Sequence, residues 1–449
     1  MASRQDQLHS YQFTVQRVVS ALVMRDTDPA QPPFRRVAGA TLVGVLLAAL
    51  GVGGAAAFGA LRPGTSGKWR NDKAIVVEQE SGALFVYRDQ VLHPVLNQAS
   101  ALLILNSAGA PTVVVSRAAL ADAPRGETLG IPGAPSSLPP ASGLRKAAWT
   151  VCSTPDGSVL FVGGGPSGGT PLGDKGMLVT GPGSQTYLVW HGRKHLIREP
   201  GAALAALVWS ARPQVAVAQA LLHAVPSGTD LVTPPVPDRG KTVPAGKIGQ
   251  LYGVTSGTRT DAFLVTGDGL ASVTPMQAAL LRAAPETAAV QGGGQLLPLT
   301  AAEFSALVQG KQVKPFAPDP GGDGALPAAP PEVLDGQPDE VCTAADGITV
   351  GAARPDLSRA LKTASATAEG AVLADRIVVP PGSGALVRTE TGVLTLVTDL
   401  GRRHALPVPD AVGALGYGGQ EPVAVSSQMV ALLPAGPALD PAAAVQPAQ

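Results

Sequence analysis

The chain has 449 residues, of which 45% are apolar and only 4% are aromatic, so a core must be built mainly from Ala, Val and Leu. Lysine plus arginine equals aspartate plus glutamate at 33 each, which excludes the basic excess of a nucleic-acid-binding protein and the charge-driven disorder of an acidic or basic tail. The 54 glycines and 42 prolines favour turns and short strands over a helical bundle.

The first predicted element is an amphipathic helix within residues 1–36. Its apolar residues recur at spacings of three and four, which places them on one helix face: Leu8, Tyr11, Val15, Val18, Val19, Leu22 and Val23. We expect this helix to end at Asp26 and Asp28-Pro29. Such a face either rests on a membrane surface or docks on a partner protein, and the sequence leaves both open. The candidate partner-binding residues are Tyr11, Val15, Val18 and Leu22.

The second predicted element is a transmembrane helix over residues 37–61. This segment contains no charged residue and exceeds the roughly 20 apolar residues that cross a bilayer. A cleaved signal peptide is the alternative, because small residues near its end resemble a cleavage site. The segment before Arg36 is too long for an ordinary signal-peptide start, and the apolar run is too long for its core, so we expect a retained anchor.

The orientation of this anchor is only weakly encoded by charge, since basic residues lie on both sides of it. Cys152 and Cys342 both follow the span, and an oxidising exterior would allow them to pair. We therefore expect a cytoplasmic N-terminus and an exterior C-terminal body.

Four segments of the body share one pattern: a strand, a turn, a second strand, a tight turn and a third strand, followed by a short Ala-rich helix. The segments are 73–96, 175–197, 249–275 and 384–409. Their uneven spacing excludes a regular solenoid or propeller, and chance similarity in Ala/Val-rich sequence is the alternative to true repeats. The expected domains are repeats at 69–125, 175–235, 236–318 and 384–436, with a flexible tail at 437–449.

Two insertions separate the repeats, at 126–174 and 319–383, and each contains one cysteine. We expect them to form one discontinuous core, which makes the body an α+β fold of small β-rich repeats around that core. A Cys152–Cys342 disulfide would close a loop of about 190 residues and contribute roughly 4–5 kcal/mol in the chain-entropy model. Two unpaired buried thiols are the alternative.

Three motifs resemble catalytic or binding sites without their required context. Gly240-Lys241-Thr242 lacks the earlier glycine of a phosphate-binding loop, and residues 163–169 fit both GxGxxG and GxSxG without a helix to follow. His191 and His195 approach metal-ligand spacing but straddle a hairpin and have no accompanying carboxylate ligand. His93 and His404 fall on third strands, which suggests a structural role. We therefore predict no catalytic, cofactor-binding or metal-binding residues, and no cofactor.

Several blocks together resemble a known family. They are SYQFTVQRVVSALVMRDTDP at 10–29, VLHPVLNQASALLIL at 91–105, GIPGAP at 130–135, the Trp149-x-x-Cys152 pair and Cys342. They are similar to EccB, the single-span membrane component of actinobacterial type VII (ESX) secretion machines. The resemblance implies a cytoplasmic N-terminal helix, one membrane helix and an elongated exterior domain. In that domain four repeats, which look like a phage cell-wall-binding module, surround a disulfide-linked core.

The resemblance also implies partners and a location. The partners are the FtsK-like motor ATPase EccC, the channel-like EccD, EccE, a subtilisin-like mycosin protease and, in a homo-oligomer, further copies of the chain. The location is the cell membrane, with the C-terminal domain in a periplasm-like space. We expect a structural subunit for protein export with no catalysis of its own. The alternatives are a membrane-anchored protein that binds a cell-wall polymer, and an ATP hydrolase, as some family members are labelled.

Overall fold

We describe the fold from a computed structural model, whose described residues are 3–25, 34–61, 69–107, 109–316 and 324–448. The side chains of 23–24, 34–38 and 55–61 lie outside this description. The chain divides into two units, Met1–Trp69 with Val115–Ala121, and Arg70–Val114 with Asp122–Gln449.

The first unit contains the predicted N-terminal helix, α1 (Arg4–Met24). It begins with a capping box, in which the Ser3 hydroxyl accepts the Asp6 N–H at 3.3 Å and the Asp6 carboxylate accepts the Ser3 N–H at 3.1 Å. The helix ends where Arg25 adopts a left-handed conformation, with φ at 56°. Asp26 and the Asp-Pro pair predicted to end it lie outside the described residues.

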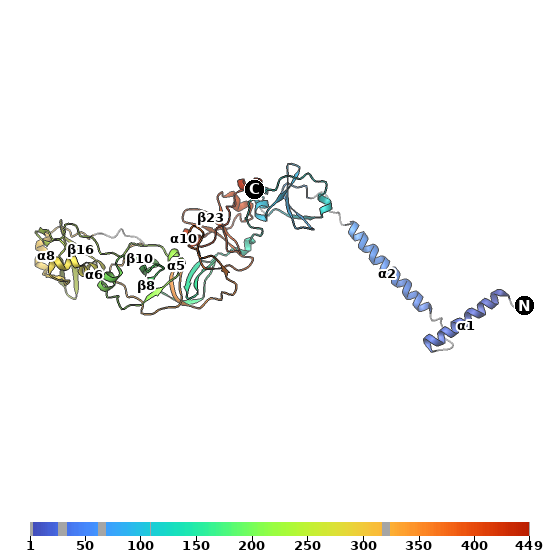
Figure 1. The fold of residues 1–449 in the computed structure, drawn as a ribbon, viewed down its shortest axis with the longest axis horizontal. Coiled ribbons are helices and arrows are strands. Elements are labelled where there is room, and N and C mark those ends of the chain that lie inside the picture. Colours follow the sequence, from blue (N-terminus) through green and yellow to red (C-terminus); the bar gives the residue numbers. More distant parts are fainter. Residues whose placement is uncertain (1–2, 26–33, 62–68, 108, 317–323, 449) are drawn as a thin grey trace. The chain divides into compact units, whose positions relative to one another are not determined.

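The second helix, α2 (Phe34–Leu61), covers the predicted membrane segment (Figure 1). Across the described part of the chain, however, no helix is both long enough and apolar enough to cross a membrane. The expectation of a membrane span at 37–61 is therefore not met within the described residues. Only the side chains from Gly39 to Gly54 are described in this segment, and that stretch is shorter than the roughly 20 residues that a span needs.

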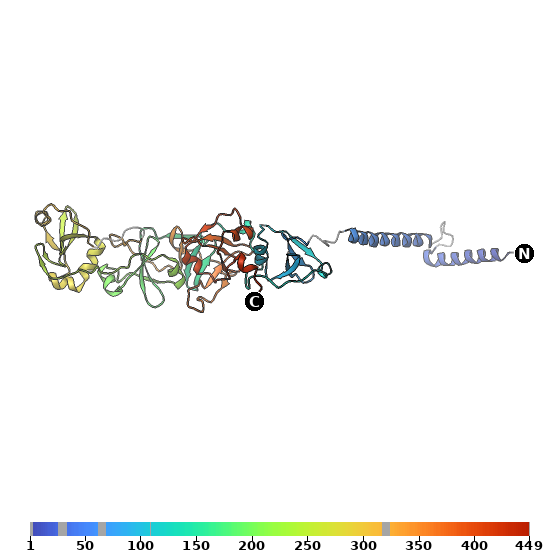
Figure 2. The ribbon, with the colours of Figure 1, turned by 90° about the horizontal axis from the view of Figure 1, so that it is seen from above.

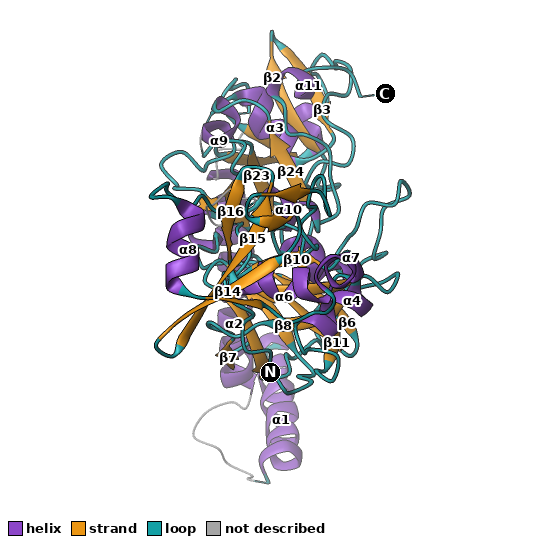
Figure 3. Ribbon diagram, turned by 90° about the vertical axis from the view of Figure 1, so that its left-hand side faces the viewer, coloured by secondary structure: helices purple, strands orange, loops and turns teal. Residues whose placement is uncertain are grey.

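The second unit contains four small sheets of the same design, whose strands are drawn in orange in Figure 3. Three consecutive strands form an antiparallel meander, and a fourth strand joins the outer side of the first. In the second, third and fourth sheets this added strand runs parallel to its neighbour. The first two sheets are β1 (Ile75–Glu78), β2 (Leu84–Arg88), β3 (Val91–Val95) and β4 (Thr112–Val115), then β8 (Met177–Thr180), β9 (Thr186–Trp190), β10 (Arg193–Leu196) and β11 (Gln214–Ala216). The third and fourth are β14 (Leu251–Ser256), β15 (Arg259–Thr266), β16 (Gly269–Val273) and β17 (Leu297–Leu299), then β22 (Ala385–Arg388), β23 (Leu394–Val397), β24 (Arg403–Leu406) and β25 (Val423–Ala424).

Short helices follow each meander, as the Ala-rich segments indicate. They are α3 (Gln98–Leu105), α4 (Pro200–Ala206), α6 (Pro275–Ala283) and α9 (Asp410–Ala414). The third sheet differs because α7 (Pro285–Gln291) and α8 (Ala301–Val308) flank its last strand. Figure 1 shows α6 beside β16, with which it is in contact, and Figure 2 shows the same ribbon from above. The remaining short elements of this unit are η2 (Ala141–Gly143), α5 (Gln219–Ala224), β12 (Thr242–Val243), β13 (Gly246–Lys247), α10 (Ser427–Ala431) and α11 (Pro441–Ala444), whereas η1 (Arg117–Leu120) belongs to the first unit.

A seven-stranded central sheet is assembled from two segments that are far apart in the sequence. Its order is β20-β21-β6-β5-β18-β19-β7. The earlier segment supplies β5 (Thr150–Thr154), β6 (Gly157–Phe161) and β7 (Gly168–Pro171). The later segment supplies β18 (Val341–Ala344), β19 (Gly347–Ala352), β20 (Leu361–Lys362) and β21 (Arg376–Val378). Formation of this sheet therefore closes a long loop, which contains the residues between the two segments.

Apolar clusters connect the sheets of the second unit. One face of the central sheet packs Trp149 and Leu160 against Leu221 of α5 and Val430 of α10. A second cluster joins α3 of the first repeat to the fourth sheet, and a third joins the second sheet to α6. A four-stranded sheet with one helix is close to the smallest unit that buries a stable apolar face, so the shared clusters add apolar burial to each of them.

Candidate functional site

The disulfide lies in the middle of the central sheet. Cys152 of β5 and Cys342 of β18 face each other directly in the antiparallel register, and their sulfur atoms are bonded across a sequence separation of 190. Both residues are buried, and Val159, Phe161 and Ala352 pack around them. The predicted pairing of the two lone cysteines is therefore present, and it joins the two segments of the central sheet covalently.

A polar contact reinforces the same junction. The Ser158 N–H donates to Oδ2 of Asp375 at 2.7 Å and its hydroxyl donates to the same oxygen at 2.5 Å, across 217 residues. The Ser365 hydroxyl donates to the other carboxylate oxygen. Burial opposes ionisation of Asp375, but these hydrogen bonds outweigh it and lower the pKa of the carboxyl. The sequence does not predict this pair, because a serine and an aspartate so far apart carry no local pattern.

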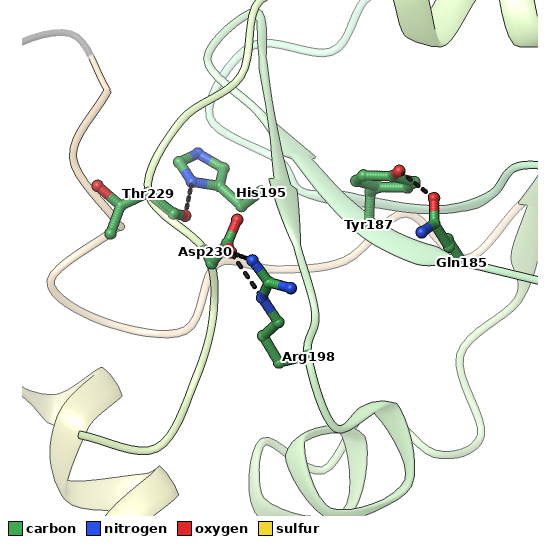
Figure 4. Close-up of polar contacts among 6 residues, drawn as sticks. All are labelled: Gln185, Tyr187, His195, Arg198, Thr229 and Asp230. Carbon is green, nitrogen blue, oxygen red and sulfur yellow. Dashed lines mark hydrogen bonds and ion pairs between the residues drawn. The ribbon is translucent and has the colours of Figure 1, made fainter. Parts of the chain in front are cut away.

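Three of the four small sheets are closed by a buried or half-buried histidine on the third strand. Nδ1 of the ring contacts a backbone carbonyl on a later segment, and the residue before that carbonyl is a glycine that lies against the ring. The pairs are His93 with Glu127 O at 3.1 Å, His195 with Thr229 O at 2.8 Å and His404 with Pro437 O at 3.0 Å. We call each set of histidine, glycine and carbonyl a histidine closure. Figure 4 shows His195 with the Thr229 carbonyl of one closure, together with the ion pair of Arg198 and Asp230 and the hydrogen bond from Tyr187 to Gln185.

Glycine is required in these closures because the ring occupies the space of a side chain. A Cβ atom at Gly436 would lie 2.1 Å from Cε1 of His404, and one at Gly228 would lie 2.4 Å from the same atom of His195. Each glycine ends a Pro-x-Gly triplet, at 124–126, 226–228 and 434–436. A third-strand histidine with a Pro-x-Gly triplet downstream is thus the sequence signal that could have found all three closures.

The two histidines with metal-ligand spacing do not come together. His191 lies in the β9–β10 turn, where its ring stacks on Trp190 and Nε2 lies 2.9 Å from Oδ1 of Asp174. His195 belongs to the closure with Thr229. Within the described ranges, no group of three or more His, Cys, Asp or Glu side chains could hold a metal ion.

The two glycine motifs lead into strands rather than helices. Gly168 begins β7 at the edge of the central sheet. Lys241 forms an ion pair with Asp238 at 2.6 Å, and Thr242 begins the β12–β13 hairpin. Neither loop therefore presents the amides of a helix N-terminus to a phosphate group.

The candidate partner-binding face of α1 is exposed to solvent. Tyr11 is 71% exposed and Leu22 is 78% exposed, and Val15 and Val18 are exposed as well. The helix is not cleanly amphipathic, since the exposed Phe13 lies off this face with the Arg17 guanidinium 5.8 Å from its ring centre. Large exposed side chains in a row are typical of a contact surface.

Two large cavities occur among the described residues. One of about 960 Å³ is lined by Trp149, Trp190 and Asp346, and the other, of about 1190 Å³, lies beside α6 and is lined by Phe263 and Met276. Nε1 of the buried Trp149 has no hydrogen-bond partner within the described structure.

Together these features define a class: a mixed α+β protein in which small, repeated β sheets share cores with a disulfide-bonded central sheet. The family model for the type VII secretion system ESX-1, transport TM domain B, matches residues 1–448. The chain therefore belongs to the EccB family.

Relatives and solved structures agree with this assignment. A protein of Mycolicibacterium smegmatis named ESX-3 secretion system ATPase EccB3 is 29% identical over 96% of this chain and 88% of its own length. The ESX-2 secretion system ATPase EccB2 of Mycobacterium tuberculosis is 34% identical over 56% of this chain and 53% of its own length. A chain of the intact ESX-5 inner membrane complex is similar with a TM-score of 0.62 and 26% identity, covering 100% of this chain and 96% of that one. A chain of the EccB3 dimer from the ESX-3 core complex is similar with a TM-score of 0.60 and 25% identity, covering 83% of this chain and 100% of that one.

Proposed function

We propose that this chain is a single-span structural subunit that supports the exterior side of a type VII secretion complex during protein export. The observation that carries the proposal is the family match over residues 1–448, supported by the likeness to a chain of the ESX-5 inner membrane complex. In this proposal α2 is the membrane helix, α1 is cytoplasmic and the β-rich unit is exterior. The disulfide supports the exterior location, because cytosolic proteins rarely keep such bonds.

Limited proteolysis tests this topology. Protease added outside intact cells stripped of their wall should degrade the chain from residue 69 onward and leave α1 intact. A protected β-rich unit with a degraded α1 would reverse the proposed orientation.

We propose that α1 binds two other membrane subunits of the complex, the FtsK-like motor ATPase EccC and the channel-like EccD. EccE and the mycosin protease are further proposed partners of the chain. The support for binding by α1 is its row of exposed apolar side chains. Replacing Val15, Val18 and Leu22 with Asp should release these subunits on purification while the chain stays in the membrane fraction. The matched control replaces Gln5, His9 and Gln16 with Asp, which adds three carboxylates to the opposite face of the helix. If the variant with Asp at Val15, Val18 and Leu22 still copurifies with these subunits, the apolar face of α1 contacts lipid instead of protein.

The proposed domain arrangement follows the sheets. Segments 126–174 and 319–383 supply all seven strands of the central sheet, which supports a discontinuous core between the four repeats. We propose that the core and repeats form the rigid exterior body, and that a second copy of the chain joins it, as in the structure described as an EccB3 dimer. Light scattering of the detergent-solubilised chain measures that copy number, and a monomer at all concentrations would refute the pairing.

The relatives named ATPases make ATP hydrolysis the second candidate function. We propose that this chain does not hydrolyse ATP, because both glycine motifs lead into strands. Turnover should remain at background when the purified chain is increased tenfold. Activity that scales with protein and is lost in Lys241→Ala would refute this proposal.

A further inference from the structure

A small cavity with three basic side chains opens on the central-sheet face that carries the disulfide. The strand pair β20–β21 places Lys362 directly opposite Arg376, and both line this cavity of about 280 Å³. The neighbouring pair, Leu361 and Ile377, packs on the other face in the main core. Arg354, which follows the end of β19, also lines the cavity.

The opposed cations need an explanation. Side chains directly opposite each other in an antiparallel pair lie on the same face, and like charges at such positions destabilise the sheet. Within the residues that the structure describes, no carboxylate lies within ion-pair distance of Lys362 or Arg376. The repulsion between these two side chains is therefore left uncompensated by the protein itself.

The surrounding charges do not remove the excess. Arg354 forms an ion pair with the buried Glu340, whose Oε1 lies 3.6 Å from the guanidinium Nε, so Lys362 and Arg376 are the cations of this cavity without an ion pair among the described residues. Asp156 is the single carboxylate lining the cavity, against three cations. The whole chain has equal numbers of basic and acidic residues, so this local excess does not follow from composition.

We propose that this cavity is an oxyanion site that binds a phosphate group. The planar guanidinium forks of Arg354 and Arg376 match two oxygens of a phosphate, and the Lys362 ammonium adds a point charge. The cavity is smaller than the roughly 300 Å³ at which pockets for drug-sized ligands begin, which suits one anionic group. Binding would turn the opposed cations from a repulsive pair into two arms of one site. This function is separate from the proposed structural role in secretion.

Isothermal titration of the full-length chain in detergent, with inorganic phosphate against sodium chloride of equal ionic strength, tests the site. We expect saturable binding of phosphate, and a weakening of about tenfold in Lys362→Gln and in Arg376→Gln, as expected for loss of one charge-assisted hydrogen bond. Asp156→Asn should tighten binding because it removes the opposing charge. Lys247→Gln, which removes an exposed lysine of β13, is the matched control and should bind as the wild type does.

The melting temperature gives a second readout, in which removal of a charged side chain is expected not to destabilise the chain. Without phosphate, Lys362→Gln should be at least as stable as the wild type, because the repulsion is relieved. With phosphate, only the wild type and the control should gain melting temperature. Glycerol phosphate distinguishes the two possible sources of the phosphate group. If it binds more tightly than inorganic phosphate, the site is assigned to a phosphate of a lipid or polymer. If it binds equally or more weakly, the site is assigned to the free ion. Absence of any phosphate-dependent gain in the wild type, or an equal gain in Lys362→Gln and Arg376→Gln, would overturn the proposal.

Discussion

The third small sheet differs from the other three in the side chains that fill the space between its third strand and the segment that returns beside it. In all four, a later segment returns beside the third strand, with bridges at Leu92–Arg125, Lys194–Ser227, Ser272–Pro315 and Arg403–Ala435. The next positions are histidine and glycine in the first, second and fourth sheets, but Val273 and Phe316 in the third. The backbone hydrogen bond survives the exchange, since the Phe316 N–H donates to Ser272 O at 2.8 Å as the Gly436 N–H donates to Arg403 O at the same distance.

The backbone bridge is therefore common to all four repeats, whereas the side chains that fill the space beside it differ between the third sheet and the others. A histidine closure fills the space with a ring and satisfies one carbonyl. The third sheet fills it with apolar contact between Phe316 and the cluster containing Val273. Its inserted helices add more apolar surface, as the 4.6 Å ring contact of Phe263 with Phe304 of α8 shows.

The largest expected effect comes from removing the disulfide of the central sheet, which lies outside all four small sheets. Cys152→Ala and Cys342→Ala should each destabilise the chain by roughly 4–5 kcal/mol in the chain-entropy model. The double variant should lose no more than either single one, because the partners form one bond. Calorimetry measures the loss, and intact mass after alkylation without reductant checks the bond. Two alkylated cysteines in natively exported protein would contradict it.

The next effect separates the two kinds of closure. Gly436→Ala should destabilise by about 3 kcal/mol, because the new Cβ overlaps the His404 ring and overpacking costs of this size are usual. Gly201→Ala in α4 is the control; nothing lies within 4 Å of its Cβ position, and a helix favours Ala over Gly. Equal stability of the two variants in urea unfolding would show that the ring moves aside freely.

The third sheet should respond to the opposite change. Phe316→Ala should cost about 2 kcal/mol, less than for a fully buried phenylalanine because this ring is half-buried. Its effect on unfolding should not depend on pH, since the seal contains no titratable group. Val232→Ala, at an exposed side chain, is the control and should change stability little.

The smallest effect is a dependence on pH in the fourth sheet. Burial lowers the pKa of His404, the hydrogen bond with Pro437 partly restores it, and Arg402 lowers it further. The unfolded chain therefore binds a proton more readily, so stability is complete above the ordinary histidine pKa of about 6.5 and decreases as the pH falls below it. Melting temperatures between about pH 7.5 and pH 5 should show a shallower slope in His404→Gln. An unchanged slope would mean that other groups cause the acid sensitivity.

The parts of the fold that could be predicted are those with short-range signals. The three-strand meanders follow from alternating apolar residues and turn residues such as Asp268-Gly269, and helix α1 follows from its three- and four-residue spacing. The fourth strand of each sheet was not predicted, because segments such as 214–216 are too short to show a period.

The site was predictable only where residue type was rare. Two cysteines in the whole chain made their pairing a natural hypothesis, whereas Ser158 with Asp375 and Lys362 opposite Arg376 depend on register across long separations. Nothing within a few residues of either pair encodes that register. The spacing of His195 to His191 approaches that of metal ligands but carries no information on the contact that the ring makes with the Thr229 carbonyl, 34 residues away.

The bond between Cys152 and Cys342 also sets the path of mechanical load. The second and third sheets lie between these cysteines in the sequence, and the first and fourth lie outside them. Tension applied to the two ends of the chain would pass through the sulfur bridge and leave the enclosed loop slack. Reduction would release a hidden length of about 650 Å when that loop is fully extended, at about 3.4 Å per residue. A chain anchored at one end and pulled at the other thus behaves as a shorter tether that shields half of its repeats from force.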